Sequence, residues 1–181
     1  MKGLVFTEFL EMVEEAYSPE MVEKIISASH LKTKGAYTSV GTYDYREMVE
    51  LITHLSQLTN TPIPELEKTY GRYLFKKLVS RYPDVISSTK NAFECLKSVD
   101  DNIHVEVRKL YPDAELPHFK YTQVNSQCLI MDYFSTRPFS NLAEGLMLGC
   151  IEHYKENISI HSQTLTENGK SFVRFTLKRL S

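Results

Sequence analysis

The hydrophobic pattern changes its period part-way along the chain, and this change limits the folds open to it. Up to about residue 110, apolar residues recur at the three- and four-residue spacing of amphipathic helices. From His118 onward, most segments alternate between apolar and polar residues, as strands do. Asn168-Gly169, between the last two alternating runs, predicts a hairpin turn. The sequence therefore predicts an α+β fold, with an N-terminal helical half packed on a C-terminal half that carries a four-stranded antiparallel sheet.

The periodic runs also predict the individual elements. Ser18-Pro19-Glu20 is a helix start, with a serine cap, proline in the first turn and an acid near the positive helix end. Helices are expected over residues 3–17, from residue 19, and over 45–58, 64–83, 92–110 and 141–154. Strands are expected over residues 118–122, 127–137, 158–166 and 171–180. Together they suit a single domain over 1–181, with a helical N-terminal subdomain over 1–60 and a second subdomain over 61–181.

Composition excludes several classes of protein. The net charge is -2, so the chain has no bulk attraction for nucleic acid or an anionic membrane. The N-terminal segment is amphipathic and acidic, unlike a signal peptide or a membrane span, so a cytoplasmic location is expected. Three well-separated cysteines suit a reducing compartment. The six histidines include no pair four residues apart on a helix, so a bound metal would need a single histidine or a cofactor that supplies its other ligands.

His104 is the first residue that could carry chemistry. It lies at the edge of the apolar stripe of the expected 92–110 helix, next to Ile103 and Val107. A histidine in such a place is most often a packed structural residue. The alternative is an axial ligand, with one neutral imidazole directed into an apolar pocket. Pro117, thirteen residues later, is by itself an ordinary turn proline before a strand.

Three polar side chains share one face of the expected 127–137 strand. Tyr133, Ser135 and Arg137 alternate with other residues, and Pro138 then ends the strand. The planar fork of arginine suits a carboxylate or phosphate. Arg137 could equally pair with an acid of a neighbouring strand, while a nucleotide phosphate is disfavoured because the chain has no glycine-rich phosphate loop. No nucleophile elbow or assignable acid pair indicates a hydrolase.

Taken together, these residues resemble the haem nitric oxide/oxygen binding (H-NOX) family in its stand-alone bacterial form, which is related to the haem domain of soluble guanylate cyclase. The resemblance rests on a helical His104, on Pro117 and on a Tyr-x-Ser-x-Arg motif at 133–137, and it extends over the whole chain. It implies haem b buried between the two halves. His104 would be the proximal iron ligand, on the haem-ligating helix of the second subdomain. Tyr133, Ser135 and Arg137 would hold the two propionates, and Pro117 would press on the haem face.

The family also implies a distal pocket that selects among gases. Oxygen-binding members carry a distal tyrosine five residues after the motif arginine, and here that position is Leu142. The other pocket positions are apolar as well: Val5, Phe9, Leu74, Leu78 and Leu146. Bound dioxygen gains from a hydrogen-bond donor, whereas nitric oxide on ferrous iron does not require one. The resemblance therefore predicts a pocket selective for nitric oxide, with carbon monoxide as a second ligand.

The expected function is a haem-based nitric oxide sensor that is not itself an enzyme. By analogy with the family, nitric oxide weakens the His104–iron bond, and the helical half shifts relative to the sheet half. The signal would pass to a separate protein such as a histidine kinase, a diguanylate cyclase or a chemotaxis protein. No structural zinc is expected, because the C-terminal hairpin has no cysteine. The alternatives are a redox or oxygen-handling haem protein and a non-haem module that binds an acidic ligand.

Overall fold

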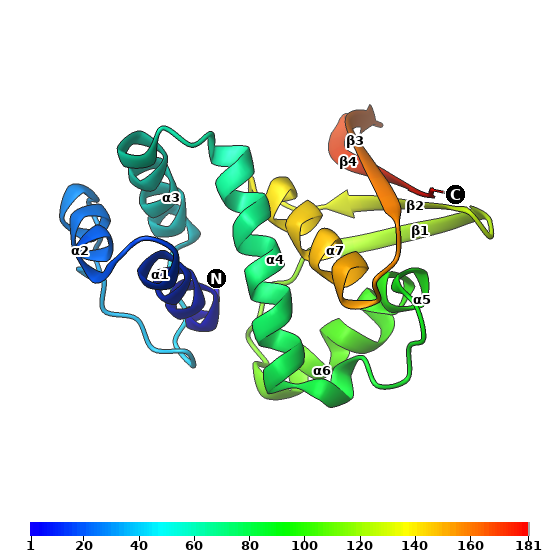
Figure 1. Ribbon diagram of the computed structural model, residues 1–181, viewed down its shortest axis with the longest axis horizontal. Helices are drawn as coiled ribbons and strands as arrows, with labels where there is room; N and C mark the ends of the chain where they lie inside the picture. Colours follow the sequence, from blue (N-terminus) through cyan, green and yellow to red (C-terminus); the bar gives the residue numbers. More distant parts are fainter. Residues whose placement is uncertain (181) are drawn as a thin grey trace.

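The computed structural model describes residues 1–180 and confirms the α+β arrangement (Figure 1). The helices and strands in chain order are α1 (Gly3–Ala16), α2 (Pro19–Ala28), α3 (Tyr45–Thr59), α4 (Ile63–Arg81), α5 (Ala92–Lys97), α6 (His104–Leu110), β1 (His118–Asn125), β2 (Cys128–Phe134), α7 (Ser140–His153), β3 (Ile158–Glu167) and β4 (Lys170–Arg179). A short 3₁₀ helix at Pro83–Val85 follows α4, and a π-helix at Val99–Ile103 separates α5 from α6.

Local signals set several element ends where the sequence predicts them. The Ser18 hydroxyl accepts a hydrogen bond from the Met21 amide, and the Asp44 carboxylate accepts one from the Arg46 amide, so both side chains cap helices. Asn168 and Gly169 have φ values of 50° and 74°, the left-handed conformation that a two-residue hairpin turn requires. The β3–β4 hairpin is therefore confirmed.

The four strands form one antiparallel sheet in the order β1-β2-β4-β3. In its register, Leu129, Met131 and Tyr133 of β2 lie opposite Leu177, Phe175 and Val173 of β4. These residues share one face because strand side chains alternate. Five of the six are buried, and Val173 is half-buried, so this face of the sheet forms part of the core.

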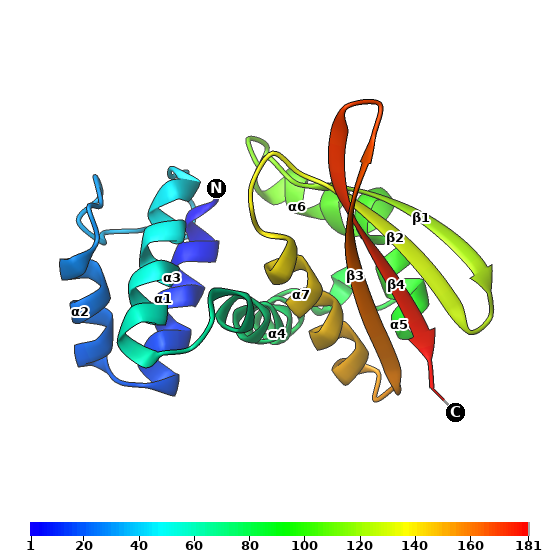
Figure 2. The ribbon, with the colours of Figure 1, turned by 90° about the horizontal axis from the view of Figure 1, so that it is seen from above.

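The apolar core divides into two clusters that meet at α4 and α7. The first lies among α1, α2, α3 and α4, with Leu142 of α7 added to it. The second lies between α5, α7 and the inner face of the sheet, with Phe75 of α4 added to it. Leu146 packs against both clusters. Figure 2 shows this order, with α4 end-on between the N-terminal helices and α7, and with the sheet beyond α7.

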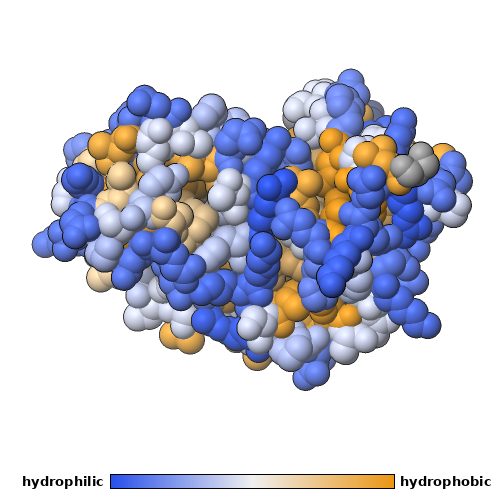
Figure 3. Space-filling model, viewed as in Figure 1, coloured by the Kyte–Doolittle hydropathy of each residue, from blue (hydrophilic) through white to orange (hydrophobic). Residues whose placement is uncertain are grey.

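The surface seen in Figure 3 is mainly hydrophilic, and its largest group of apolar residues lies beside α7 and the β3–β4 hairpin. Within residues 1–180, no helix is both long enough and apolar enough to cross a membrane.

The single helix expected over 92–110 is wrong. It is replaced by α5, the π-helix and α6, because the chain widens its turn after Ser98. The amide of Ile103 donates to the Ser98 carbonyl and the amide of His104 donates to the Val99 carbonyl, each five residues back. The Ser98 hydroxyl bonds the Cys95 carbonyl, and such local side-chain bonds compete with the regular helix. Apolar spacing alone does not reveal this change, since the stripe continues through it.

Candidate functional site

His104 is the buried histidine of the site region. It begins α6 directly after the π-helix, its residue is 8% exposed, and its ring centroid lies 6.2 Å from that of Phe119 on β1. Burial lowers the pKa of His104, and the nearby Asp100 carboxylate opposes this shift. The imidazole is therefore neutral near pH 7, which is the form that binds a transition metal.

The carboxylate of Asp100 lies between His104 and the start of β1. Its Oδ1 atom is 2.9 Å from Nδ1 of His104. Its Oδ2 atom accepts a 2.9 Å hydrogen bond from the Phe119 amide and pairs with Nδ1 of His118. Asp100 was not among the site residues expected from the sequence, although its place four residues before His104 puts it one helical turn away.

Pro117 lies immediately before β1, in the segment that is held by the hydrogen bond between the Phe119 amide and Asp100. It is half-buried. The Phe119 ring lies near the rings of both His104 and Tyr133, with a centroid distance of 5.3 Å to Tyr133. The structure thus gathers His104, the Pro117 segment and Tyr133 into one region.

The expected strand over 127–137 is too long, because β2 ends at Phe134. The Ser135 hydroxyl accepts a 3.0 Å hydrogen bond from the Arg137 amide, which turns the chain before α7. Tyr133 therefore projects from a strand, whereas Ser135 and Arg137 lie in the following bend. The three still lie close together: burial raises the pKa of Tyr133, while the nearby Ser135 hydroxyl and the charge of Arg137 oppose this rise.

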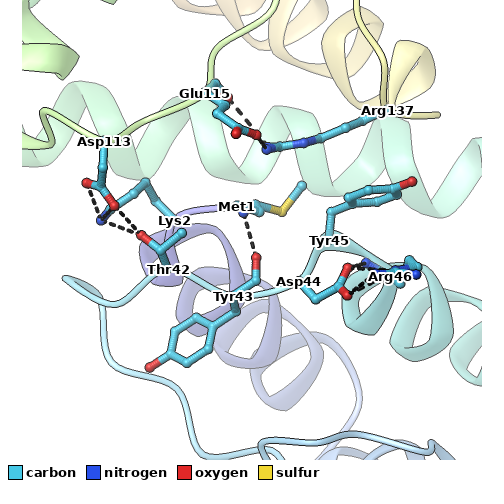
Figure 4. Close-up of a pocket in the computed structure, with 10 residues that line it drawn as sticks. All are labelled: Met1, Lys2, Thr42, Tyr43, Asp44, Tyr45, Arg46, Asp113, Glu115 and Arg137. Atoms are coloured by element: carbon cyan, nitrogen blue, oxygen red, sulfur yellow. Dashed lines mark hydrogen bonds and ion pairs between the residues drawn. The ribbon is translucent and has the colours of Figure 1, made fainter.

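Arg137 lines a cavity of about 340 Å³ between the N-terminal helices and the segment that follows α6 (Figure 4). Its guanidinium group pairs with Glu115 and lies 5.7 Å from the centre of the Tyr45 ring. The Arg137 side chain is 16% exposed, whereas that of Glu115 is 81% exposed. A pair with such an exposed partner is weak, about 0–1 kcal/mol, so Glu115 is a replaceable partner for this arginine.

The remaining lining residues give the cavity a mixed charge. Lys2 pairs with Asp113 at 3.0 Å, and Arg46 pairs with Asp44 at 2.6 Å. The hydrogen bonds of Asp113 with Thr42 and Lys2 lower the pKa of Asp113 to about 2. Of these cations Arg137 is the best placed to take another carboxylate, because its acidic partner is the most exposed.

The six residues expected to line a distal pocket belong to one core cluster. Phe9, Leu74 and Leu142 are buried, and Val5, Leu78 and Leu146 are partly buried. They come from α1, α4 and α7, so helices distant in the sequence bring them together.

Two glycines let α4 and α7 approach closely enough for this contact. A Cβ atom on Gly145 would lie 2.3 Å from the Lys68 carbonyl oxygen, and one on Gly71 would lie 2.5 Å from the Leu142 carbonyl oxygen. Only a residue without a Cβ fits at these positions. This pair could not be predicted, because nothing in the sequence marks the two helices as neighbours.

The donor set suits a haem. A neutral, buried imidazole can ligate iron, an arginine with a replaceable acidic partner can take a carboxylate, and the apolar cluster can cover a macrocycle. Nδ1 of His104 is buried and makes no well-oriented hydrogen bond within residues 1–180, as expected of a side chain held in a special role. Across these same residues, no three histidine, cysteine or acidic side chains cluster as a metal site would require.

Comparison with known proteins agrees with this geometry. A sequence profile of the family described as Haem-NO-binding matches residues 2–162. The ferrous unliganded H-NOX protein from K. algicida is 40% identical, with a TM-score of 0.92 over 100% of this chain and 97% of that one. The H-NOX protein from S. oneidensis in its Fe(II)NO state is 26% identical, with a TM-score of 0.91 over 100% of both chains.

Two further relatives extend the comparison. The H-NOX from Shewanella woodyi, solved with IWP-051 in the Fe(II)CO state, is 37% identical and has a TM-score of 0.83 over 99% of this chain and 95% of that one. Soluble guanylate cyclase gcy-33 of Caenorhabditis elegans is 28% identical over 141 residues, which make up 76% of this chain. The chain spans only 14% of the length of that cyclase.

Proposed function

Because the chain belongs to the haem-NO-binding (H-NOX) family, we propose that it is a haem-based sensor that binds nitric oxide at ferrous iron and signals to a separate protein. The main support for this proposal is His104. Its imidazole is buried and neutral, and it lies beside the carboxylate of Asp100, which suits a proximal iron ligand. The cofactor is haem b, and when bound it would supply the iron at which the gas is held.

Tyr133, Ser135 and Arg137 hold the two haem propionates in this proposal. Two carboxylates on one cofactor edge need several donors when they are partly buried. Arg137 supplies a charged fork, and its present partner Glu115 is exposed enough to be exchanged for a propionate. Pro117 is proposed to contact the haem face, since Asp100 ties its segment to His104.

The gas preference rests on the apolar cluster. Val5, Phe9, Leu74, Leu78, Leu142 and Leu146 are proposed to line the distal side, and none of these side chains has a hydrogen-bond donor. Nitric oxide and carbon monoxide bind ferrous iron without a hydrogen-bond donor. Bound dioxygen carries partial negative charge, and the side chains of this pocket have no hydrogen-bond donor to stabilise it. The Fe(II)NO and Fe(II)CO states of the similar S. oneidensis and S. woodyi proteins support this preference.

The two core clusters support an output by relative movement. Residues 1–60 are proposed to act as a helical subdomain and residues 61–181 as the haem-ligating and sheet subdomain, because the clusters are separate except where they meet at α4 and α7. A gas can shift the arrangement only if its binding differs between the two positions. His104 and the Pro117 segment would supply that difference, since both belong to the second subdomain and would contact the haem.

In this proposal the chain is a signal-input module in the cytoplasm and not an enzyme. Its output partner is a separate signalling protein, such as a histidine kinase, a diguanylate cyclase or a chemotaxis protein.

Absorption spectroscopy of protein purified after expression with adequate haem tests the proposal. We expect a coloured protein whose reduced form binds nitric oxide and carbon monoxide. His104→Gly should lose haem, or hold it only when free imidazole is added. His161→Ala, which changes an exposed histidine on β3, is the matched control and should keep the wild-type spectrum. Colourless wild-type protein, or full haem occupancy in His104→Gly without imidazole, would contradict the assignment.

A further inference from the structure

The two oxygens of Asp100 join two segments that lie apart in the sequence. Oδ1 lies 2.9 Å from Nδ1 of His104, and Oδ2 accepts the 2.9 Å hydrogen bond from the amide of Phe119. Oδ2 also pairs with Nδ1 of His118. One carboxylate therefore touches the start of α6 and the start of β1, which follows Pro117 directly.

The contact with His104 joins two atoms that have no other partner. Within residues 1–180, Oδ1 of Asp100 and Nδ1 of His104 are both buried and neither makes a well-oriented hydrogen bond. A buried polar atom without a partner destabilises the fold, and a hydrogen bond between these two atoms would satisfy both at once. The 2.9 Å separation is already that of an N–H···O bond.

The π-helix places Asp100 in this position. Asp100 lies inside it and His104 follows it, so the wide turn sets how the two side chains face each other. Single π-turns inside helices are frequent at functional sites. Asp101, the next residue, is exposed, and its side chain makes no hydrogen bond or ion pair in the part of the chain that the structure describes. Asp100 and Asp101 carry the same charge, so Asp100 differs from its neighbour in the position of its carboxylate.

We propose that Asp100 is a positioning residue for the iron ligand, an inference that rests on the proposed haem function. Its Oδ1 accepts the Nδ1 proton of His104, which leaves the Nε2 lone pair for the iron and fixes the plane of the ring. The negative charge of Asp100 also makes Nε2 of the imidazole a stronger ligand for the iron. Through Oδ2 the same carboxylate ties the ligand to the Pro117 segment, so a displacement of His104 is transmitted to the backbone at Phe119.

Resonance Raman spectra of the ferrous, unliganded holoprotein test this role through the iron–histidine stretching band. We expect the band to move to lower frequency in both Asp100→Asn and Asp100→Ala, because each variant removes the carboxylate charge that faces Nδ1 of His104. The rate of haem loss should rise about 10–100-fold in Asp100→Ala. Asp100→Asn is nearly isosteric and keeps an acceptor for the Phe119 amide, so it guards against a variant that simply fails to fold.

Asp101→Asn is the matched control and should leave both the band and the haem loss rate unchanged. An unchanged band in both Asp100 variants would overturn the inference while leaving the proposed function intact. An equal shift in Asp101→Asn would overturn it too, since a general charge effect would then explain the result. A wild-type protein with no iron–histidine band would overturn the proposed function together with this inference.

Discussion

The phenol of Tyr70 on α4 donates a 2.5 Å hydrogen bond to the backbone carbonyl of Val5 on α1. Tyr70 is fully buried in the same cluster as Phe9, Leu74 and Leu142, and burial raises the pKa of its hydroxyl well above the usual value. The hydroxyl is thus held by the backbone and is not free to donate to a bound gas. The proposed distal side can therefore include this tyrosine without gaining a free donor.

This arrangement predicts gas selectivity. Reduced wild-type protein should bind nitric oxide and carbon monoxide and form no stable dioxygen complex in air, as followed by its absorption spectrum. Tyr70→Phe should behave in the same way, because the hydroxyl it removes is already occupied. Leu142→Tyr should bring a free hydroxyl to the distal side and lengthen the life of a dioxygen complex, at an overpacking cost of about 1–3 kcal/mol. A persistent oxy spectrum in the wild type would show that the assignment to nitric oxide is wrong.

The second prediction concerns the propionates. Arg137→Ala should speed haem loss more than Ser135→Ala, because a charged donor to a carboxylate contributes roughly 1.5–3 kcal/mol and a neutral hydroxyl roughly 1 kcal/mol. Transfer of haem to an excess of an apo-globin measures both rates. Arg46→Ala is the control, since Arg46 lines the same cavity but is exposed and pairs with Asp44. If Arg46→Ala loses haem as fast as Arg137→Ala, the specific role of Arg137 is refuted.

The third prediction concerns the crossing of α4 and α7. Gly145→Ala should lower the free energy of unfolding by about 1–3 kcal/mol, because its Cβ would meet the backbone of Lys68 and the helices must separate. For a domain of this size, the midpoint temperature of thermal unfolding, Tm, should fall by roughly 2–4 °C for each kcal/mol that is lost. In an open helix, the same substitution would instead stabilise by about 1 kcal/mol. The sign of the change therefore decides whether close packing or helix propensity dominates at this position.

The fourth prediction concerns the ion pairs between α1 and α4. Lys77 lies 2.9 Å from Glu11 and 3.2 Å from Glu15, and Arg81 lies 2.9 Å from the buried Glu8. Lys77→Glu should speed amide hydrogen exchange in α1 relative to β2 and β4, by about fivefold for each kcal/mol of stabilisation that is lost.

A neighbouring lysine gives the control for this effect. Lys76 pairs with Glu152 of α7, so Lys76→Glu makes the same charge change away from α1. Equal exchange in α1 for the two variants would mean that the α1–α4 pairs do not hold the N-terminal helices in place.

Local patterns in the sequence were sufficient to predict most helices and strands and to identify the family. The change of period, the Ser18 cap and the Asn168-Gly169 turn depend on neighbours in the chain, so the helices, the hairpin and the α+β class could be predicted. The spacing of His104, Pro117 and the Tyr-x-Ser-x-Arg motif was likewise enough to identify the family, which the profile match confirms.

Only the tertiary structure showed the features that hydrophobic spacing does not encode. The π-turn before His104 keeps the apolar stripe of a regular helix, so hydrophobic spacing could not reveal it. The end of β2 before Ser135 depends on a side-chain bond to the Arg137 amide, which an alternating pattern does not show. The contacts of Asp100 with Phe119, of Arg137 with Glu115 and of Gly145 with Lys68 join residues at least 19 positions apart. Such contacts form only when whole elements pack together, because their geometry is set by the sum of many side-chain volumes and not by any local signal.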